Sequence, residues 1–449
     1  MKIAILGFGI EGKSTLKFLK RSPIYGGAKI EILDQKRDKN YLKNLDKFDV
    51  VFRSPGVPYN LPQIQRAIKK GIRFSSATKL FFEQLHGTTR TEHGHHGQIV
   101  IGITGTKGKG TTATLLYQIL KNSGFKAALA GNIGKSALEI LPKIDSRTMV
   151  ILELSSFQLQ DLAKSPRLAA ILDIFPDHLD SHKNFKEYIN AKANIGRFQN
   201  SKQDKIFYSS DNKFSKWIAD QSPARKIPVS PENIGLPGLQ IPGDHNQKNA
   251  AMAKAIAQNL DCPDHIIDKT IAEFKGIEHR LEFVRGIKIH SNVLKNVGMN
   301  SRIDFYNDSA STNPQTSAAA VLSFSNNQIT SQSTNQLTIL IAGGKDKNLN
   351  YKPLADAIKK ACNVKAVMLF GENKNKIASV ISNQKIVIRK GGNLESAIKI
   401  AYKTAKSLIA DYRLPVTIVF SPGAASFDMF KDYKDRGRKF KKIVKQIKK

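Results

Sequence analysis

Short apolar runs alternate with segments of helical spacing along most of this chain. In its first part, residues 2–6, 28–34 and 48–56 carry apolar runs of strand length. Residues 13–21, between the first two runs, carry apolar positions at helical spacing. Strands separated by helices predict a parallel sheet whose connections cross over through the helices. We therefore expect an α/β unit at the start of the chain.

Two further units of the same kind follow. Apolar runs recur at 98–105, 148–156 and 168–180, and again at 336–344, 364–372, 385–392 and 415–423. A polar, glycine-rich segment at 86–97 is expected to link the first unit to the second. The pattern predicts an α/β protein of three domains in series. These are a Rossmann-like domain at 1–96, a P-loop ATPase-type domain with a parallel sheet at 97–284, and a Rossmann-like domain at 285–449.

The chain is strongly basic, which raises two functional alternatives. It has 449 residues, with 71 Lys and Arg against 37 Asp and Glu, and a formal net charge of +34. Such a charge is typical of proteins that bind nucleic acid or an anionic membrane surface. Aromatic residues make up only 8% and form no stacking motif among the basic residues. We therefore expect no nucleic-acid partner, and interpret the lysines as scattered over solvated faces.

The densest basic cluster is the tail at 434–449, in which apolar residues recur at helical spacing. This pattern predicts an amphipathic terminal helix. Docking of this helix on the last domain is favoured over contact with anionic lipid, which leaves at most a peripheral membrane contact. No run of about 18 apolar residues is present, so no segment is expected to span a membrane. Cys262 and Cys362 match no metal or disulfide spacing, and we expect a cytoplasmic protein.

The strongest chemical signal is a glycine-rich turn between a buried strand and a helix. An apolar run at 99–103 is followed by three glycines and two lysines, and then by apolar positions of helical spacing. Without Cβ atoms the backbone can approach phosphate oxygens and point N–H groups at them, and a helix N-terminus adds positive potential. Lys109 would neutralise the β- and γ-phosphates, and a following hydroxyl would help to hold Mg²⁺. The predicted ATP-binding residues are Gly105, Thr106, Lys107, Gly108, Lys109, Gly110, Thr111 and Thr112.

An acidic residue stands at the end of a later strand in the same domain. Glu153 lies within the apolar run 148–156. A carboxylate in such a run costs free energy unless it meets a cation, and ligands of open α/β sheets bind at the carboxyl ends of strands. A Mg²⁺ near nucleotide phosphates would satisfy Glu153. A solvated strand end is the structural alternative.

A second glycine-rich turn opens the chain. Residues 7–14, GFGIEGKS, contain G-x-G-x-x-G directly after a strand, and Asp34 ends the next strand. This pattern is typical of dinucleotide binding, as in NAD-dependent dehydrogenases. Any ligand that places a pyrophosphate over such a turn would suit these glycines, so the glycines alone do not identify the ligand.

Motifs along nearly the whole chain resemble the Mur ligase family. They are SPGVP at 54–58, TGTKGK at 104–109, GNIG at 131–134, DHLD at 177–180, GDHNQKNAA at 243–251, FKGIEHR at 274–280, YNDSASTNP at 306–314 and SPGAASFDMFKDYKDRG at 421–437. The last two resemble the branch that adds D-glutamate. The resemblance implies an ATP-dependent ligase of peptidoglycan precursor synthesis. It would add D-glutamate to UDP-N-acetylmuramoyl-L-alanine through an acyl phosphate and release ADP and phosphate.

The resemblance also assigns roles to matching residues. The catalytic residues would be Lys109, Glu153, His178 and Lys192. The metal, Mg²⁺, would lie near Thr111, Glu153, His178 and Lys192, the last as a carbamate. ATP would further contact Asn246, Asn249, Arg280 and Asp308. The UDP-linked muramoyl substrate would contact Gly7, Phe8, Gly9, Ile10, Gly12, Asp34, Gln35, Ser54, Pro55, Gly56 and Asn132. The amino acid would contact Thr312, Lys347, Ser426 and Phe427. We expect a monomer.

Two positions depart from the family pattern. Gly110 stands where the family has Ser or Thr directly after the lysine, so Thr111, with Thr112 behind it, is the candidate metal-facing hydroxyl. Ala310 stands where the D-glutamate-adding branch has a lysine that pairs with the acceptor's carboxylate, which leaves Lys347 or another base for that role. Two alternatives stay open: a Mur or folylpolyglutamate synthase-type ligase with another acceptor, and a basic P-loop nucleic-acid-binding NTPase.

Overall fold

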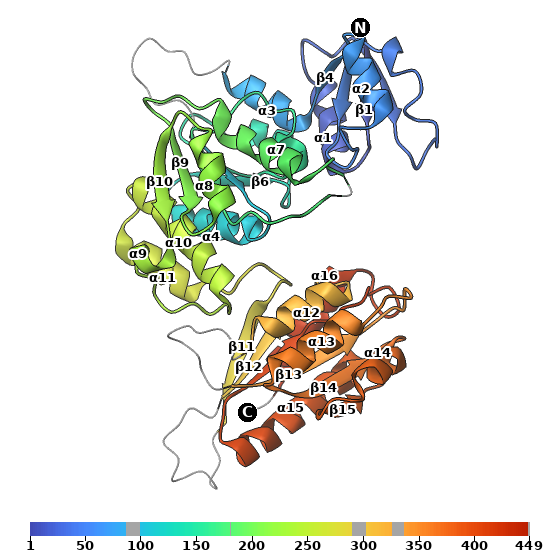
Figure 1. Ribbon diagram of the computed structural model, residues 1–449, viewed down its shortest axis with the longest axis vertical. Coiled ribbons are helices and arrows are strands. Elements are labelled where there is room, and N and C mark those ends of the chain that lie inside the picture. The colour runs from blue at the N-terminus through green and yellow to red at the C-terminus, as the bar shows by residue number, and fades with distance from the viewer. Residues whose placement is uncertain (87–98, 180, 290–301, 326–335, 448–449) are drawn as a thin grey trace. The chain divides into compact units, whose positions relative to one another are not determined.

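The computed structural model describes residues 1–86, 99–179, 181–289, 302–325 and 336–447 (Figure 1). The chain forms two compact units. The first comprises Met1–Pro237 and Gln247–Ala272, and the second Gly238–Asn246 and Glu273–Lys449. In the described residues the first unit holds two sheets and the second holds one, which agrees with the predicted α/β class.

The division into three domains stays a prediction. Almost all of the expected linker at 86–97 lies outside the described residues. The boundary expected between residues 284 and 285 falls inside a strand that spans Glu282–Lys288.

The first sheet has the strand order β2-β1-β3-β4, and its strands run parallel. The strands are β1 (Lys2–Leu6), β2 (Lys29–Leu33), β3 (Val50–Arg53) and β4 (Arg73–Ser75). The helices are α1 (Ile10–Leu19), the 3-10 turn η1 (Leu45–Lys47), α2 (Pro62–Lys69) and α3 (Ala77–His86). Because β1 lies between β2 and β3, the first glycine-rich turn lies where the strand order reverses, and ligands of open sheets bind at such points.

The second sheet has the order β10-β9-β8-β5-β7-β6 and is also parallel. Its strands are β5 (Val100–Thr104), β6 (Ala127–Gly131), β7 (Met149–Glu153), β8 (Leu168–Ile171), β9 (Lys205–Ser209) and β10 (Arg225–Val229). Its helices and 3-10 turn are α4 (Lys109–Asn122), α5 (Ala137–Ile140), η2 (Leu141–Lys143), α6 (Ser156–Leu159), α7 (Phe185–Arg197), α8 (Lys213–Asp220), α9 (Pro231–Ile234), α10 (Asp244–Asn259) and α11 (Asp264–Glu273). The order again reverses at β5, so the second glycine-rich turn occupies the equivalent position.

The third sheet has the order β11-β12-β16-β13-β14-β15. Its strands are β11 (Glu282–Lys288), β12 (Arg302–Asn307), β13 (Leu337–Gly343), β14 (Val364–Phe370), β15 (Val387–Lys390) and β16 (Val416–Phe420). Only the β11–β12 pair is antiparallel among these described strands. Its helices are α12 (Pro314–Leu322), α13 (Lys352–Ala361), α14 (Lys374–Ile381), α15 (Leu394–Tyr412) and α16 (Tyr433–Gln446). The turns that follow β12, β16 and β13 therefore share one edge of the sheet.

Each compact unit has its own hydrophobic core. In the first unit, one cluster of buried residues includes Ile5 of β1, Phe81 of α3, Leu138 of α5 and Leu152 of β7, so it joins the first and second sheets. The central strands are buried along their whole length, as β5 and β7 show. Strands covered on both faces read as continuous apolar runs, which is why the sequence pattern located them.

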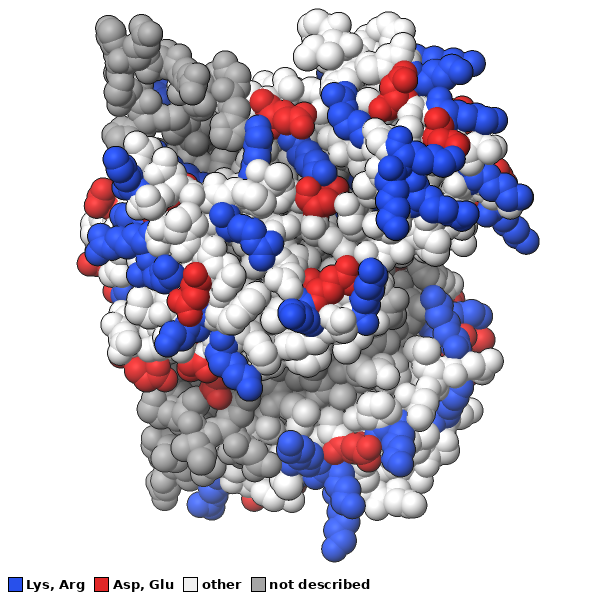
Figure 2. Space-filling model, turned by 45° about the horizontal axis from the view of Figure 1, so that its top comes forward, with Lys and Arg blue, Asp and Glu red and all other residues white. Residues whose placement is uncertain are grey.

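The basic tail forms α16 and packs in the core of the second unit. Phe440 and Val444 are fully buried, and the Phe440 ring stacks on that of Phe420 with centroids 4.6 Å apart. The prediction that this helix docks on the last domain is confirmed. On the face drawn in Figure 2, basic side chains are spread over the surface, with acidic side chains among them. In the described residues, no helix has both the length and the apolar character needed to cross a membrane.

Candidate active site

The predicted ATP loop has the expected strand–turn–helix geometry. β5 ends at Thr104 and α4 begins at Lys109, with Gly108 between them at a φ of 83°. A Cβ atom on Gly108 would lie 2.1 Å from Asn249 Oδ1, so the turn requires glycine here. The Lys109 ammonium donates to the carbonyl oxygens of Gly105 (3.1 Å) and Thr106 (3.0 Å). The lysine therefore lies over the turn that would hold phosphate.

The two threonines after Lys109 differ in exposure. Thr112 is fully buried, and its hydroxyl donates to Asn249 Oδ1 over 3.4 Å. Thr111 is partly exposed. Thr111 therefore carries the hydroxyl that a ligand can reach. Thr112 and Asn249 bond to each other, and Asn249 packs against Gly108 of the turn.

Glu153 ends the strand beside the loop. The register of β5 and β7 pairs it with Ile103, one residue before Thr104. Its side chain is buried, and its Oε1 accepts a hydrogen bond from the Asn132 amide at 3.2 Å. A Cβ atom on Gly131 would lie 2.2 Å from the Glu153 carbonyl oxygen, so glycine is needed next to Asn132. The structure therefore brings together a residue predicted for the metal and one predicted for the UDP-linked substrate.

The segment before His178 contacts the loop through Thr106. The Thr106 N–H donates to the Asp173 carbonyl (2.9 Å), so it is already used by the protein. The Thr106 hydroxyl accepts from the Phe175 N–H (2.9 Å) and shares a hydrogen bond with the Tyr188 hydroxyl (2.9 Å). His178 itself has a φ of 53° and a half-exposed side chain. The segment that precedes His178 thus contacts the turn through Asp173 and Phe175, and the role of His178 in a metal site stays a prediction.

Lys192 projects from α7 and is buried, with 1% of its surface exposed. Its Nζ donates to the Gly105 carbonyl at 2.8 Å. Burial, and after it the charge of Lys109, holds the pKa of Lys192 well below its usual range, against the opposing charges of Asp177 and Glu153. The structure thus places this helical lysine at the loop, in an environment that favours its neutral amine.

The first glycine-rich turn is also held by specific contacts. Gly7 has a φ of 84°, and a Cβ atom on Gly12 would lie 2.2 Å from the Gly7 carbonyl oxygen. The Ser54 hydroxyl donates to that same oxygen at 2.7 Å. Asp34 Oδ2 accepts from the Phe8 N–H at 2.6 Å, and this bond is the main reason that the pKa of Asp34 is lowered. The structure therefore gathers these predicted UDP-substrate residues around one turn.

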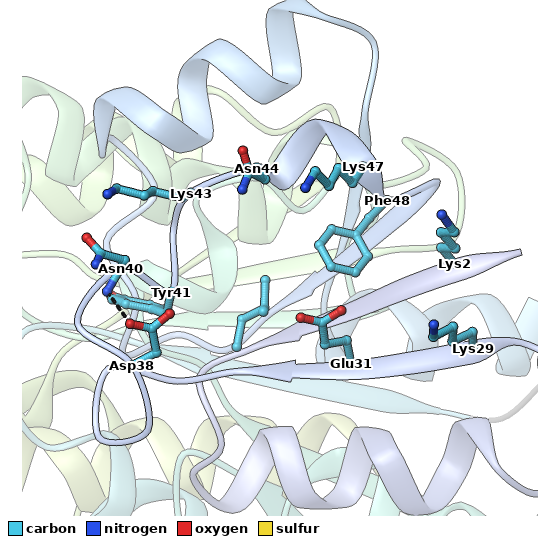
Figure 3. A pocket seen from close by; sticks show the side chains of 11 residues that line it. Lys2, Lys29, Glu31, Asp38, Asn40, Tyr41, Lys43, Asn44, Lys47 and Phe48 are labelled. Carbon is cyan, nitrogen blue, oxygen red and sulfur yellow. Dashed lines mark hydrogen bonds between the residues drawn. The ribbon is translucent and has the colours of Figure 1, made fainter.

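A cavity of about 370 Å³ lies elsewhere in the first sheet, between β2 and the segment that leads to β3 (Figure 3). Its lining residues are Lys2, Lys29, Glu31, Leu33, Asp38, Asn40, Tyr41, Lys43, Asn44, Lys47 and Phe48. None of them is among the residues predicted for the UDP-linked substrate. The two sets of residues do not overlap, although Leu33 of the cavity directly precedes Asp34.

In the second unit, Asp308 follows β12 at the carboxyl edge of the sheet. Its Oδ2 accepts from the Ser421 hydroxyl after β16 (2.7 Å), and its Oδ1 accepts from the Leu281 N–H (3.2 Å). Burial raises the pKa of Asp308 to about 7, although the Ser421 bond opposes the shift. Arg280, predicted for ATP, is exposed, and Asn246 donates to the Pro242 carbonyl at 2.6 Å.

The predicted amino-acid residues follow the strands of this same edge. The Lys347 ammonium stands 5.5 Å from the centroid of the exposed Phe427 ring. Ser426 is buried, whereas Thr312 is exposed. Lys347 and Phe427 are thus brought together from turns 80 residues apart.

Sequence reasoning missed several contacts that join the first sheet to the second. Gln158 donates to Glu11 Oε1 (2.6 Å), and Ser14 donates to the Ser136 hydroxyl (2.8 Å). The Asp161 carboxylate forms ion pairs with the Arg53 guanidinium (3.3 Å) and the Lys79 ammonium (2.7 Å). Glu11 and Ser14 lie within the quoted GFGIEGKS motif, but a motif does not reveal its tertiary partners.

Comparison with known proteins identifies the family to which this chain belongs. Residues 103–235 match the Mur ligase middle domain. A UDP-N-acetylmuramoylalanine–D-glutamate ligase of Acetivibrio thermocellus is 32% identical, over 99% of this chain and 96% of its own length. The chain belongs to the Mur ligase family. A ligase of the same name from Clostridium botulinum strain 657 is 31% identical, over 99% of this chain and 97% of its own.

Solved structures of Mur ligases share the fold. UDP-N-acetylmuramate-alanine ligase MurC from Thermotoga maritima is 15% identical, with a TM-score of 0.53 and full coverage of both chains. The MurF ligase of the same organism, in complex with ADP, is 14% identical, with a TM-score of 0.54 over 99% of this chain and 95% of that one. As a Mur ligase, the chain is an ATP-dependent ligase of peptidoglycan precursor synthesis, as the sequence predicted. This decides against the nucleic-acid-binding alternative.

Proposed function

We propose that this Mur ligase joins D-glutamate to the L-alanyl carboxyl group of UDP-N-acetylmuramoyl-L-alanine and converts ATP to ADP and phosphate. The observation that carries the proposal is one glycine-rich turn on which two lysines converge. The Nζ atoms of Lys109 and Lys192 both donate to the Gly105 carbonyl, and Glu153 ends the neighbouring strand. The names of the full-length relatives support this choice of substrates.

A carboxylate must be activated before an amine can displace one of its oxygens. Transfer of the γ-phosphoryl group gives an acyl phosphate, the amine attacks it, and phosphate leaves from a tetrahedral intermediate. The carboxylate and the γ-phosphate are both anions, so their approach requires compensating positive charge. Lys109 and the N-terminus of α4 supply that charge at the turn.

Mg²⁺ fits the donors at this loop. No three His, Cys, Asp or Glu side chains in the described part of the chain are grouped to hold a metal by themselves. Mg²⁺ ordinarily binds through one or two carboxylates together with phosphate oxygens and waters. The buried Glu153 carboxylate and the partly exposed Thr111 hydroxyl would hold it, and the resemblance also assigns His178 to this metal. Bound there, it would offset negative charge on the phosphates.

We expect Lys192 to be carbamylated. A neutral amine adds to CO₂ to give a carbamate and releases one proton, and the lowered pKa of Lys192 favours that neutral amine. The modification replaces this neutral amine beside Lys109 with an anion. An anion in that position suits both Lys109 and a bound Mg²⁺.

The acceptor site belongs to the second compact unit. We assign the acceptor amino acid to Thr312, Lys347, Ser426 and Phe427. Because Ala310 carries no charge, Lys347 is the residue that we assign to the acceptor's side-chain carboxylate. We further propose that the enzyme acts as a cytoplasmic monomer.

The test is a reaction of the purified protein with ATP, Mg²⁺, UDP-N-acetylmuramoyl-L-alanine and one amino acid from a panel, with the product identified by mass. D-Glutamate should give the ligated product together with ADP and phosphate. Lys109→Ala and Glu153→Ala should abolish ADP release, whereas Lys121→Ala, an exposed lysine near the other end of α4, should not. A product with another amino acid in place of D-glutamate would favour the alternative acceptor.

A further inference from the structure

Arg436 is a fully buried arginine in the first turn of α16. None of the four hydrogen bonds described for its guanidinium goes to a carboxylate. Nε donates to Ser309 Oγ (3.0 Å) and Nη2 to the Ser309 carbonyl (2.9 Å). Nη1 donates to the carbonyls of Ala424 (2.9 Å) and Ala425 (3.2 Å). Burial lowers the pKa of Arg436 to about 10, so the group stays charged at neutral pH.

These four bonds join turns that are far apart in the sequence. Ser309 follows β12, and Ala424 and Ala425 follow the parallel neighbour β16. The Ser309 hydroxyl also donates to the Tyr433 carbonyl at 2.8 Å, which ties the same turn to the start of α16. One guanidinium therefore holds two turns of the carboxyl edge against one helix.

The direction of the bonded carbonyls fixes the direction of the next N–H groups. In a trans peptide the C=O and the following N–H point to opposite sides, and no peptide bond in the described chain is cis. The N–H groups of Ala425 and Ser426 therefore face away from Arg436. The Ala425 carbonyl also accepts from the Lys345 N–H at 2.9 Å, so the turn that carries Lys347 joins the same arrangement.

We infer that Arg436 is a positioning residue for the acceptor amino acid, which it does not itself touch. It holds the turns at 309–312 and 424–427 in the shape in which Thr312, Ser426 and Phe427 meet the acceptor. This inference rests on the proposed function for the identity of the ligand. Without the guanidinium, the Ser309 and Ala424 carbonyl oxygens would lose this hydrogen bond, and Ala425 would keep only the bond from Lys345; the turns would rearrange to satisfy the lost bonds.

The test compares Arg436→Lys with Arg285→Lys, a control on β11 whose hydrogen bonds go to the other end of the same helix. Arg285 donates to the carbonyls of Val444 (3.3 Å), Lys445 (3.0 Å) and Ile447 (3.1 Å), so Arg285→Lys removes a similar set of bonds far along α16 from the turns. For each variant the KM values for D-glutamate and for ATP are measured. Hydrogen exchange of the peptide 421–430 and the thermal midpoint are measured alongside. If Arg436→Lys does not fold, Ser309→Ala removes one of the four acceptor atoms and serves in its place.

Arg436→Lys should raise the KM for D-glutamate about tenfold or more and should leave the KM for ATP within about twofold of the wild-type value. Hydrogen exchange of the peptide 421–430 should become faster. Arg285→Lys should leave all three at wild-type values. A wild-type KM in folded Arg436→Lys, or an equal rise in Arg285→Lys, would overturn the inference. If no amino acid saturates the wild type, the proposed function fails. In that case hydrogen exchange still tests whether Arg436 holds the turns. Faster exchange of the peptide 421–430 in Arg436→Lys supports this role, and unchanged exchange refutes it.

Discussion

Glu11→Gln should remove a pH-dependent loss of stability from the first compact unit. Glu11 lies in the first turn of α1, where its Oε1 accepts from Gln158 and its Oε2 is buried with no hydrogen-bond partner among the described residues. Burial raises the pKa of Glu11 from about 4.5 to about 7, although the Gln158 bond and the charge of Arg53 oppose the shift. The folded protein therefore holds a proton that the unfolded chain releases at lower pH.

The sign and size of the effect follow from linkage. A group whose pKa is raised on folding contributes stability that is full below its unfolded pKa and is lost as pH rises through its folded pKa. For Glu11 that window runs from about pH 4.5 to about pH 7. Each pKa unit corresponds to about 1.4 kcal/mol, so the complete loss is about 3 kcal/mol. Glutamine keeps the acceptor for Gln158 but has no charge to desolvate.

Urea unfolding followed by tryptophan fluorescence measures this difference. Trp217, the only tryptophan of the chain, packs against the same hydrophobic cluster of the first unit that contains residues of β1. Glu11→Gln should exceed the wild type in stability by about 3 kcal/mol at pH 8 and by under about 1 kcal/mol at pH 5. Glu139→Gln, an exposed carboxylate in α5, is the control and should follow the wild type. Parallel pH profiles for Glu11→Gln and the wild type would refute the reasoning.

Three other predictions address the loop and the core. Removing CO₂ and bicarbonate should lower the ligase activity of the wild type, because a carbamate on Lys192 reverses to the amine. Added bicarbonate should restore the activity, whereas the activity of Lys192→Arg should not change with CO₂ or bicarbonate. Gly108→Ala should weaken ATP binding about tenfold or more, measured by calorimetry, because its φ is 83° and its Cβ would clash with Asn249. Phe440→Ala should destabilise the second unit by about 3–5 kcal/mol in urea unfolding, because it removes a fully buried ring stacked on Phe420. Wild-type activity that does not depend on CO₂, unchanged ATP binding in Gly108→Ala, or unchanged stability in Phe440→Ala would each contradict the corresponding prediction.

The sheets were predictable because their central strands are buried on both faces. The runs at 336–344 and 415–423 became β13 and β16, which pair directly. The glycine-rich turns were predictable for a local reason, since only glycine readily adopts the positive φ of Gly7 and Gly108. Both signals can be read without knowing any tertiary contact.

The environment of the loop was not predictable in this way. A lysine on a helix is exposed by default, so nothing in the local pattern indicates that Lys192 is buried; only the family resemblance singled it out. Tyr188 and Asp173 contact the turn through tertiary pairing of separate elements, which leaves no mark in the periodicity.

Arg436 stands in a tail whose charges suggest a solvated face. Its burial follows from the close approach of α16 at Gly437, where a Cβ atom would lie 2.3 Å from His279 Nδ1.

The contact between Glu11 and Gln158 also bears on how the two glycine-rich turns work together. β7 ends at Glu153, Ser155 caps α6 in a capping box with Gln158, and Gln158 reaches Glu11 in the first turn after β1. Only four residues therefore lie between Glu153, which we assign to the metal, and Gln158, which binds Glu11 in the turn that we assign to the UDP-linked substrate. A ligase of this kind must present the substrate's carboxyl group to the γ-phosphate within a near-attack distance. A short, buried and hydrogen-bonded path between the two turns meets that requirement better than a flexible linker, because it fixes their separation before either ligand arrives.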